Sequence, residues 1–438
     1  MSVHAPAPDS APDSAPVSAP VWSIDQVRFA FPALSLNDDG VARVCLDAPA
    51  GTQVAGRAIE RMTDLMIRGC ANDGGVFRTS VASEGAMFEA HRAAAALLNA
   101  PRWEEIVFGL NTTSLLFSFS RMLSREWRPG DQIVLSKMDH DANVAPWLIA
   151  ADEHGVEVRW LDFDPESFRY CYQDLERLIG PRTRLVACNH ASNLIGTIND
   201  VAAITAAARA VGAVSVVDGV QAAPHFRVDV QAIGCDLYAT SAYKYFGPHA
   251  GVLFVREALL DRLTPLKVRP SPDQAPWKYA PGTPAFETQA GVTGAIEHIA
   301  WLGSEFGGAR EDADLGVRIA AGWRASGAWE SRLTRRFLAG LGSIPGARLY
   351  GLAGDNELAD RVPTFSFTVP GRRASEVVQD LADANVFAWA GSFYAHEVAA
   401  TLGLDAHGVV RIGMAHYTSE AEVDRALEVV EEAARRGR

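Results

Sequence analysis

Short apolar runs alternate with stretches of helical periodicity between residues 85 and 255, and this alternation constrains the fold more than any other feature. Successive units of strand, helix and strand predict a largely parallel sheet covered by helices on both faces. In such a sheet a ligand binds at the carboxyl ends of the strands. The expected strands are 106–110, 132–135, 156–161, 185–188, 215–217, 237–240 and 251–255, and the expected helices are 85–98, 114–126, 174–179 and 201–211.

The pattern changes after about Gly294 to a long helical stretch, then to strands near 348–350, 364–369 and 409–414, and to a closing helix. That last helix places Val423, Ala426, Leu427 and Val430 on one face. We therefore expect a second, smaller α+β domain. The predicted division is a disordered Ala/Pro/Ser tail at 1–20, an N-terminal segment at 21–45 that packs with the small domain, a large domain at 46–298 and a small C-terminal domain at 299–438.

Charge and composition exclude several classes of protein. The formal net charge of −13 repels phosphate backbones and anionic lipids, so we expect neither nucleic acid nor a membrane as partner. The most apolar long window, 201–223, contains Arg209 and Asp218, which are costly in a bilayer. Five widely spaced cysteines without a C-x-x-C pair predict no disulfide framework and no metal site, and favour a reducing, cytoplasmic location. The glycine motifs of dinucleotide-binding enzymes and of hydrolases are absent from the sequence.

Polar residues follow two neighbouring strands of the predicted sheet. Asp218 ends one strand, Thr240 and Ser241 end the next, and Lys244 follows at once, so we expect a carboxylate and an amine at one rim of the sheet. A lysine that forms a Schiff base must lose its proton, which burial promotes. A carboxylate aimed at a pyridine nitrogen keeps that nitrogen protonated, which makes a pyridoxal ring an electron sink. From the spacing alone, the two residues could instead form a structural salt bridge.

Five segments between residues 46 and 417 carry a family resemblance: SKMDHDAN, NHASNLIG, VDGVQAAPH, DLYATSAYK and PGTP. In this order they resemble the class V aminotransferase family of pyridoxal 5′-phosphate enzymes, most closely its cysteine-desulfurase-like branch. The resemblance implies the α/β fold of fold type I PLP-dependent transferases, with a mainly parallel seven-stranded sheet in the large domain and a smaller α+β C-terminal domain. It also implies pyridoxal 5′-phosphate as cofactor, an amino acid as substrate and a homodimer with shared active sites.

The same resemblance assigns roles around the cofactor ring. Lys244 becomes the Schiff-base lysine and Asp218 the partner of the pyridinium nitrogen. Gln221 corresponds to the residue that contacts the phenolic oxygen, and Asn193 to an asparagine on the same side of the ring. His140 matches the histidine that stacks on the pyridine face and exchanges protons, as an imidazole can near neutral pH.

Further residues are expected to bind the cofactor phosphate. Thr112 and Thr113 open a helix directly after a strand, where free N–H groups, hydroxyls and the helix dipole favour an anion, although the same residues could serve only as a helix cap. Ser241 and Tyr243 flank Lys244 where the family places phosphate ligands. Thr283, in PGTP, matches a threonine that in this family reaches the phosphate of the other subunit.

The substrate side of the site is expected around Arg411, which matches the arginine that binds the substrate carboxylate. A planar guanidinium suits a carboxylate because both have two parallel bonding positions. Looser motifs place Gly51, Arg78 and Trp389 at the substrate mouth.

The sequence departs from the desulfurases at the loop where they carry a cysteine, because the corresponding stretch, VFAWAGSFYAHEV, has none. A thiolate must attack the substrate sulfur and carry it as a persulfide, so desulfuration by that route is disfavoured. We therefore predict a carbon–sulfur lyase or β-elimination enzyme that acts on an amino acid through an external aldimine without a persulfide cysteine. The alternatives are an amino-acid epimerase or aminotransferase of the same family and, third, a non-catalytic binding protein that keeps the fold.

Overall fold

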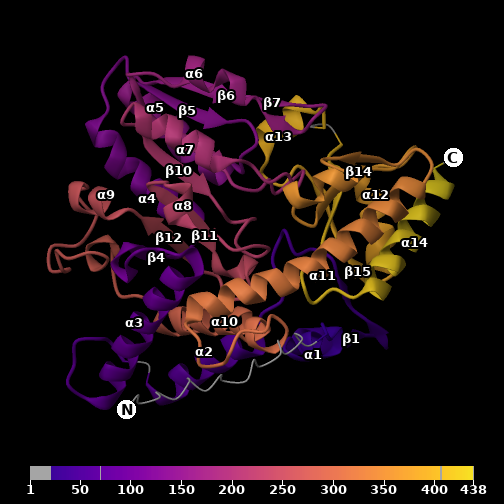
Figure 1. Cartoon of the computed structure of the whole chain (residues 1–438), viewed down its shortest axis with the longest axis horizontal. Coiled ribbons are helices and arrows are strands. Elements are labelled where there is room, and N and C mark those ends of the chain that lie inside the picture. Colours follow the sequence, from indigo (N-terminus) through magenta and orange to yellow (C-terminus); the bar gives the residue numbers. More distant parts are fainter. Residues whose placement is uncertain (1–20, 70, 405–406, 438) are drawn as a thin grey trace, which may run out of the picture.

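The largest sheet of the chain has seven strands in the order β4-β12-β11-β10-β9-β5-β6 (Figure 1). The computed structural model describes residues 21–69, 71–404 and 407–437, so the tail predicted at 1–20 lies outside the described residues. β12 is antiparallel to both its neighbours, and the other pairs are parallel. Each predicted strand corresponds to one of the seven, and the mainly parallel sheet is confirmed. The strands are β4 (Ile106–Gly109), β5 (Gln132–Ser136), β6 (Glu157–Leu161), β9 (Thr183–Asn189), β10 (Val214–Asp218), β11 (Leu237–Ser241) and β12 (Gly251–Val255).

The inner strands β5, β10, β11 and β12 are buried on both faces of the sheet, which explains why they are apolar runs rather than alternating ones. Along β5, Ile133 and Leu135 belong to one hydrophobic cluster and Val134 to another, on the opposite face. The first cluster is covered by α4 (Thr112–Leu123), α5 (Ala145–His154) and α9 (Glu257–Arg262), and the second by α3 (Arg78–Leu98), α7 (Val201–Ala210) and α10 (Phe286–Glu305).

The helices follow the prediction with two differences. α3 begins well before residue 85, because the hydroxyls of Ser80 and Ser83 donate to the carbonyls of Asn72 and Gly69 and so fit a polar first turn into the helix. α5 has no counterpart among the predicted helices, although it makes the crossover between β5 and β6. Gly155 follows it with a φ of 65°, an ordinary helix end. The predicted helix at 174–179 corresponds to α6 (Leu175–Leu178).

A second sheet of four antiparallel strands lies beside the first, in the order β13-β14-β17-β16 (Figure 1). Its strands are β13 (Arg348–Tyr350), β14 (Thr364–Thr368), β16 (Trp389–Gly391) and β17 (Val409–Gly413). It packs against α11 (Leu315–Ser343), α12 (Ala374–Asp383) and α14 (Glu420–Arg436). Val423, Ala426 and Val430 of α14 are fully buried in this layer, so the predicted apolar face of the closing helix is confirmed.

The N-terminal segment contacts this second sheet region. β3 (Val44–Cys45) pairs with β15 (Val386–Phe387), and Arg28 of α1 (Ile24–Phe29) bonds Glu422 at 2.7 Å. The predicted boundary between residues 298 and 299 falls within the continuous helix α10, so the position of a domain boundary stays a prediction. The remaining elements are β1 (Asn37–Asp38), β2 (Val41–Ala42), α2 (Gly56–Arg68), β7 (Phe163–Asp164), β8 (Arg169–Tyr170), α8 (Val230–Ile233) and α13 (His396–Thr401). In the described part of the chain, none of the helices has the length and apolar character needed to span a membrane.

Candidate active site

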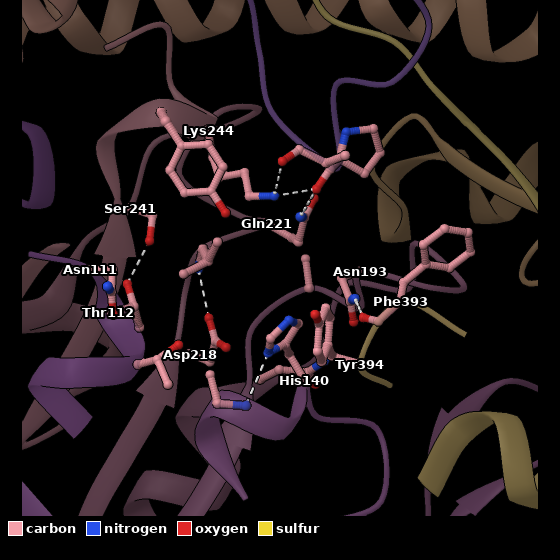
Figure 2. A pocket seen from close by; sticks show the side chains of 18 of the residues that line it. Asn111, Thr112, His140, Asn193, Asp218, Gln221, Ser241, Lys244, Phe393 and Tyr394 are labelled. Atoms are coloured by element: carbon pink, nitrogen blue, oxygen red, sulfur yellow. Dashed lines mark hydrogen bonds between the residues drawn. The ribbon is translucent and has the colours of Figure 1, made fainter. Parts of the chain in front are cut away.

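A cavity of about 380 Å³ opens at the carboxyl ends of β9, β10 and β11 (Figure 2). The turn before α4 and the segment after β5 form its walls, and residues from β16, β17 and the loop after β16 complete it from the second sheet. Most of the predicted site residues line this one cavity: Thr112, Thr113, His140, Asn193, Asp218, Gln221, Ser241, Tyr243, Lys244, Trp389 and Arg411.

Three predicted residues do not line it. Gly51 lies behind the ring of Tyr243, which would be 3.3 Å from a Cβ at that position. Arg78 is the first residue of α3 and is exposed. Thr283 lines a second cavity of about 350 Å³ together with Leu110 and His249. Within a single chain, therefore, Arg78 and Thr283 are not brought to the first cavity.

Lys244 is buried at the floor of the cavity, just after β11. Its Nζ donates to the carbonyl oxygens of Pro49 and Ala50 (Figure 2). Burial lowers the pKa of Lys244 to about 7, and the charge of Arg411 acts in the same direction, against the opposing effect of Asp218. A neutral amine, the form that can act as nucleophile or base, is thus available near neutral pH.

This pKa predicts an unusual reactivity. At pH 7 about half of the Lys244 amines should be neutral, against about 1 in 2,500 for an ordinary lysine with a pKa near 10.4. In the cofactor-free protein, pulse acetylation between pH 6 and 9 should therefore modify Lys244 with a midpoint near pH 7. Peptide mass spectrometry measures it, with free Nα-acetyl-lysine as internal reference. A midpoint that coincides with the reference would contradict the prediction.

Asp218 ends β10 and presents a buried carboxylate. Its Oδ1 accepts from the backbone N–H of Val220 at 2.9 Å, and burial raises its pKa to about 6. The next residue must be glycine, because a Cβ on Gly219 would lie 2.0 Å from the ring of Tyr238. The tight turn after β10 thus fixes where the carboxylate lies.

A segment we term the strap, residues 46–53, joins the two sheets beneath the cavity. The Pro49 carbonyl accepts from both Lys244 and Gln221, the latter at 2.9 Å (Figure 2). Thr52 donates through its hydroxyl to the carbonyl of Tyr243 at 3.0 Å. At the other end, Gly413 of β17 donates its N–H to Leu46 at 2.8 Å. The strap therefore couples the position of the lysine to the second sheet.

The strap predicts a stability effect at Gly413. A Cβ there would lie 2.1 Å from the ring of Pro49, so Gly413→Ala should lower the free energy of unfolding by about 1–3 kcal/mol. Gly327, inside α11, has nothing within 4 Å of its Cβ position, and Gly327→Ala should be neutral or stabilise by about 0.5–1 kcal/mol. Urea unfolding of both variants measures the contrast. Equal effects would contradict the close packing of the strap.

The start of α4 forms one end of the cavity. Asn111 caps the helix by accepting from the N–H of Ser114 at 2.8 Å. The Thr112 hydroxyl bonds the carbonyl of Thr240 at 2.8 Å and the hydroxyl of Ser241 at 2.7 Å, which ties the helix start to the end of β11. The first N–H groups of a helix have no partner within it and carry its positive dipole end. The site therefore combines the donors that a phosphate requires.

His140 follows β5 and is mostly buried. Its Nδ1 accepts from the N–H of Ala142 at 3.0 Å, so the neutral ring carries its proton on Nε2. Burial, together with the charges of Lys244 and Arg411, lowers the pKa of His140 to about 4. A neutral imidazole can lie against a flat aromatic ring, and the ring of Tyr394 is already 5.4 Å from it, centroid to centroid.

Arg411 of β17 is buried with its guanidinium held from two sides. Nη1 donates to the carbonyl of Asn193 at 3.0 Å, and the ring of Phe393 lies 3.8 Å from Cζ. Burial lowers the pKa of Arg411 to about 9, so it remains a cation at neutral pH. The amide nitrogen of Asn193 donates to Phe393, but its buried Oδ1 has no partner among the described residues. That oxygen is an acceptor available to a bound molecule.

Asn189 and Asp47 are polar residues near the site that the sequence prediction does not include. Asn189 lines the cavity and ends β9 directly beside Asp218 in the parallel register, so the strand-end rule that identified Asp218 would also have found it. Its Oδ1 accepts from Tyr170 at 2.6 Å. Asp47, in the strap, is mostly buried, and one of its carboxylate oxygens is unpaired in the described structure. The pKa of Asp47 is raised, because the effect of burial exceeds the opposing effect of a hydrogen bond from Trp389.

No cysteine of the described chain lines the cavity. Cys45, Cys188 and Cys235 are buried, and Cys171 is half-buried. Burial raises the pKa of Cys45 to about 12, so that thiol is a weak nucleophile. Cys70 lies outside the described residues.

A lysine and a carboxylate at the carboxyl ends of adjacent strands in a mainly parallel sheet are the arrangement expected of the fold type I class of pyridoxal 5′-phosphate enzymes. Comparison with known sequences specifies the family. The sequence pattern described as "Aminotransferase class-V" matches residues 44–426, and the chain belongs to this family.

Its relatives include cysteine desulfurases and an aminotransferase-like protein. The chain is 32% identical over 420 residues to the aminotransferase-like protein FGM3 of Gibberella zeae, covering 94% of this chain and 98% of the relative. It is 30% identical over 421 residues to a cysteine desulfurase of Salmonella dublin, covering 92% and 96%. Among solved structures, the apo cysteine desulfurase of Thermococcus onnurineus NA1 superposes with a TM-score of 0.84 at 26% identity, covering 95% of this chain and 99% of that one. The desulfurase CsdA of Escherichia coli gives 0.80 at 28% identity, with the same coverage.

Proposed function

We propose that the protein cleaves the Cβ–S bond of an amino acid by β-elimination, with pyridoxal 5′-phosphate as cofactor and without a protein persulfide. One observation carries the proposal. The cavity joins a buried amine, a buried carboxylate and a buried guanidinium, while the segment facing them supplies Trp389, Phe393 and Tyr394 and no sulfur. This arrangement supports chemistry at the α-carbon of an amino acid but offers no acceptor for a transferred sulfur atom.

The residues present fit the cofactor. Thr112 and Thr113, in the first turn of α4, and Ser241, hydrogen-bonded to Thr112, would bind the phosphate. Asp218 would bind the ring nitrogen and His140 would lie on the ring face. The unpaired Oδ1 of Asn193 provides a further acceptor. When bound, the cofactor withdraws electrons from the bonds at the substrate α-carbon.

Two side chains of the protein would then act on the substrate, one by binding it and one by accepting its proton. Arg411 binds the substrate carboxylate, since its guanidinium is fixed by Phe393 and by the Asn193 carbonyl. Lys244 accepts the α-proton, because its pKa of about 7 leaves it partly neutral at physiological pH. Its amine stays positioned by the Pro49 and Ala50 carbonyls.

We also propose a homodimer with shared active sites. Thr283 lines a second cavity with His249, whose ring stacks on Tyr243 of the first cavity at 4.6 Å. Beside it Leu110 is 81% exposed, which is unusual for a leucine next to an active site and suits a protein contact. Sedimentation of the cofactor-loaded protein tests this proposal: a monomer at micromolar concentration would contradict it.

A product assay tests the proposed reaction. The loaded enzyme, incubated with S-substituted cysteines, is expected to release thiol, pyruvate and ammonia in equal amounts. Recovery of only the mirror-image amino acid would instead identify an epimerase. Consumption that requires added keto acid, with conversion of the cofactor to its pyridoxamine form, would identify an aminotransferase. Either result would overturn the elimination.

A further inference from the structure

We propose that the substrate carries an uncharged aromatic group on its β-sulfur, and that Trp389 and Tyr394 determine this specificity. The inference rests on the proposed function, since it names the substrate class of the same site. Both side chains line the cavity while remaining 54% and 74% exposed. Large aromatic surfaces that face water at a cavity mouth are typical of ligand contacts.

The residues Trp389, Phe393 and Tyr394 form an aromatic wall of the cavity, and backbone contacts hold this wall in place. Trp389 is the cross-strand partner of Arg411 in the β16–β17 pair, so both side chains lie on one face of the sheet. The carbonyl of Tyr394 accepts from the N–H of Asp141 at 2.7 Å, beside His140. The carbonyl of Phe393 accepts from Asn193 at 2.8 Å (Figure 2). Asp141 and Asn193 belong to loops of the large sheet, so these two hydrogen bonds connect the aromatic wall to the opposite side of the cavity.

The backbone of this wall is strained in a way that favours a binding role. Phe393 and Tyr394 both have a φ of 57°, the left-handed region that side chains other than glycine adopt at a cost of about 1–2 kcal/mol each. Adjacent residues in this conformation are retained where surrounding contacts compel it, and such strain concentrates at ligand-binding sites. The two adjacent rings make different contacts: Phe393 lies against Arg411. Tyr394 lies against His140 (Figure 2).

Each charged side chain that lines the cavity already has a role toward the cofactor or the substrate carboxylate. Its charged or titratable lining residues in the described chain are His140, Asp218, Tyr243, Lys244, Tyr394 and Arg411. The cofactor and the substrate carboxylate use His140, Asp218, Lys244 and Arg411, and burial raises the pKa of the Tyr243 phenol. No charged side chain is left for the substrate's own side chain, so burying a charged one there would be costly. An aromatic group gains by stacking on Trp389 and Tyr394.

An S-aryl leaving group also explains how the reaction proceeds without a cysteine. The Cα–H and Cβ–S bonds break, and the departing thiolate takes up the proton to leave as a free thiol. Water then converts the remaining 2-aminoacrylate to pyruvate and ammonia. The sulfur keeps its oxidation state, so neither an oxidant nor a protein thiol is required.

Binding of unreactive analogues tests the specificity apart from the reaction. L-α-Methylphenylalanine and α-aminoisobutyrate both lack the α-proton, so calorimetry on the loaded enzyme measures only their affinity. The aromatic analogue is expected to bind about tenfold or more tightly than the small one. Equal affinities would overturn the proposal. If the preference holds but no thiol is released from S-phenylcysteine, the elimination fails while the side-chain preference stands.

Variants identify the residues responsible. Trp389→Ala and Tyr394→Ala should each weaken L-α-methylphenylalanine about fivefold and leave α-aminoisobutyrate unchanged. Tyr394→Phe keeps the ring and should keep the preference. Phe29 is an exposed aromatic residue of α1 that does not line the cavity, so Phe29→Ala should change neither affinity. An unchanged preference in both alanine variants, or an equal loss of affinity for both analogues, would contradict the assigned role.

Discussion

Replacing Lys244 by alanine is expected to abolish covalent attachment of pyridoxal 5′-phosphate and to lower turnover by about 10⁴-fold or more. The amine is buried, has a pKa of about 7 and is placed between two carbonyl oxygens, so no other group of the cavity can replace it as nucleophile and base. The yellow absorbance of the loaded protein and its loss in Lys244→Ala measure attachment, and a product assay measures turnover.

The composition makes the control unusually clear, because the chain has only four lysines. Lys137 and Lys267 form ion pairs with Asp162 and Asp273, and Lys278 lies over the ring of Tyr279. Borohydride reduction followed by peptide mass spectrometry should modify Lys244 alone, and Lys267→Ala should behave like the parent protein. A reduced adduct on any of the other three lysines would disprove the assignment.

Replacing Asp218 by asparagine is expected to lower kcat by about 100-fold or more while leaving the fold intact. Asparagine has nearly the same shape and can still accept from the Val220 N–H, but it carries no negative charge. The carboxylate is needed to keep a proton on the ring nitrogen, and in a buried site such a charge interaction is large. Steady-state kinetics measure kcat, and circular dichroism checks the fold.

A surface carboxylate provides the matched control for this second prediction. Asp162, half-exposed and paired with Lys137 at 2.6 Å, lies after β6 and does not line the cavity, so Asp162→Asn should leave kcat unchanged. Retention of full activity by Asp218→Asn would contradict the role of Asp218. Loss of cofactor absorbance without loss of structure would shift that role from tuning the cofactor to binding it.

Much of the large sheet could be predicted from the sequence, because a strand that is buried on both faces is a short run of apolar residues. The inner strands of the sheet are short apolar runs, whereas the edge strand β6 (Glu157–Leu161) alternates charged and apolar residues. Both patterns predict strands, and together they identify all seven. α5 was missed because its sequence, APWLIAADEH, is too apolar all round to give a clear helical period. The start of α3 was missed because its first turns are polar.

The candidate site was predictable where a residue type and a strand end coincide. Asp218 and Lys244 stand directly after strands, and the order of the motifs located His140, Asn193 and Arg411, which the structure brings to one cavity. Arg78 and Thr283 were predicted from motifs but do not reach this cavity within one chain. The role of Thr283 remains a prediction that depends on a second subunit, and the place of Arg78 at the substrate mouth remains a prediction.

The sequence by itself determined the parallel sheet, the family and the side chains at the strand ends, since each follows from neighbouring residues. Only the tertiary structure decided which groups surround Lys244 and Arg411. Pro49, 195 positions from Lys244, acts through its backbone carbonyl, which any residue would supply and no residue type can reveal. Phe393 contacts Arg411 and Tyr394 contacts His140, and both of these adjacent aromatic residues have a left-handed backbone. Such contacts arise from chain geometry over long separations, where sequence periodicity carries no information.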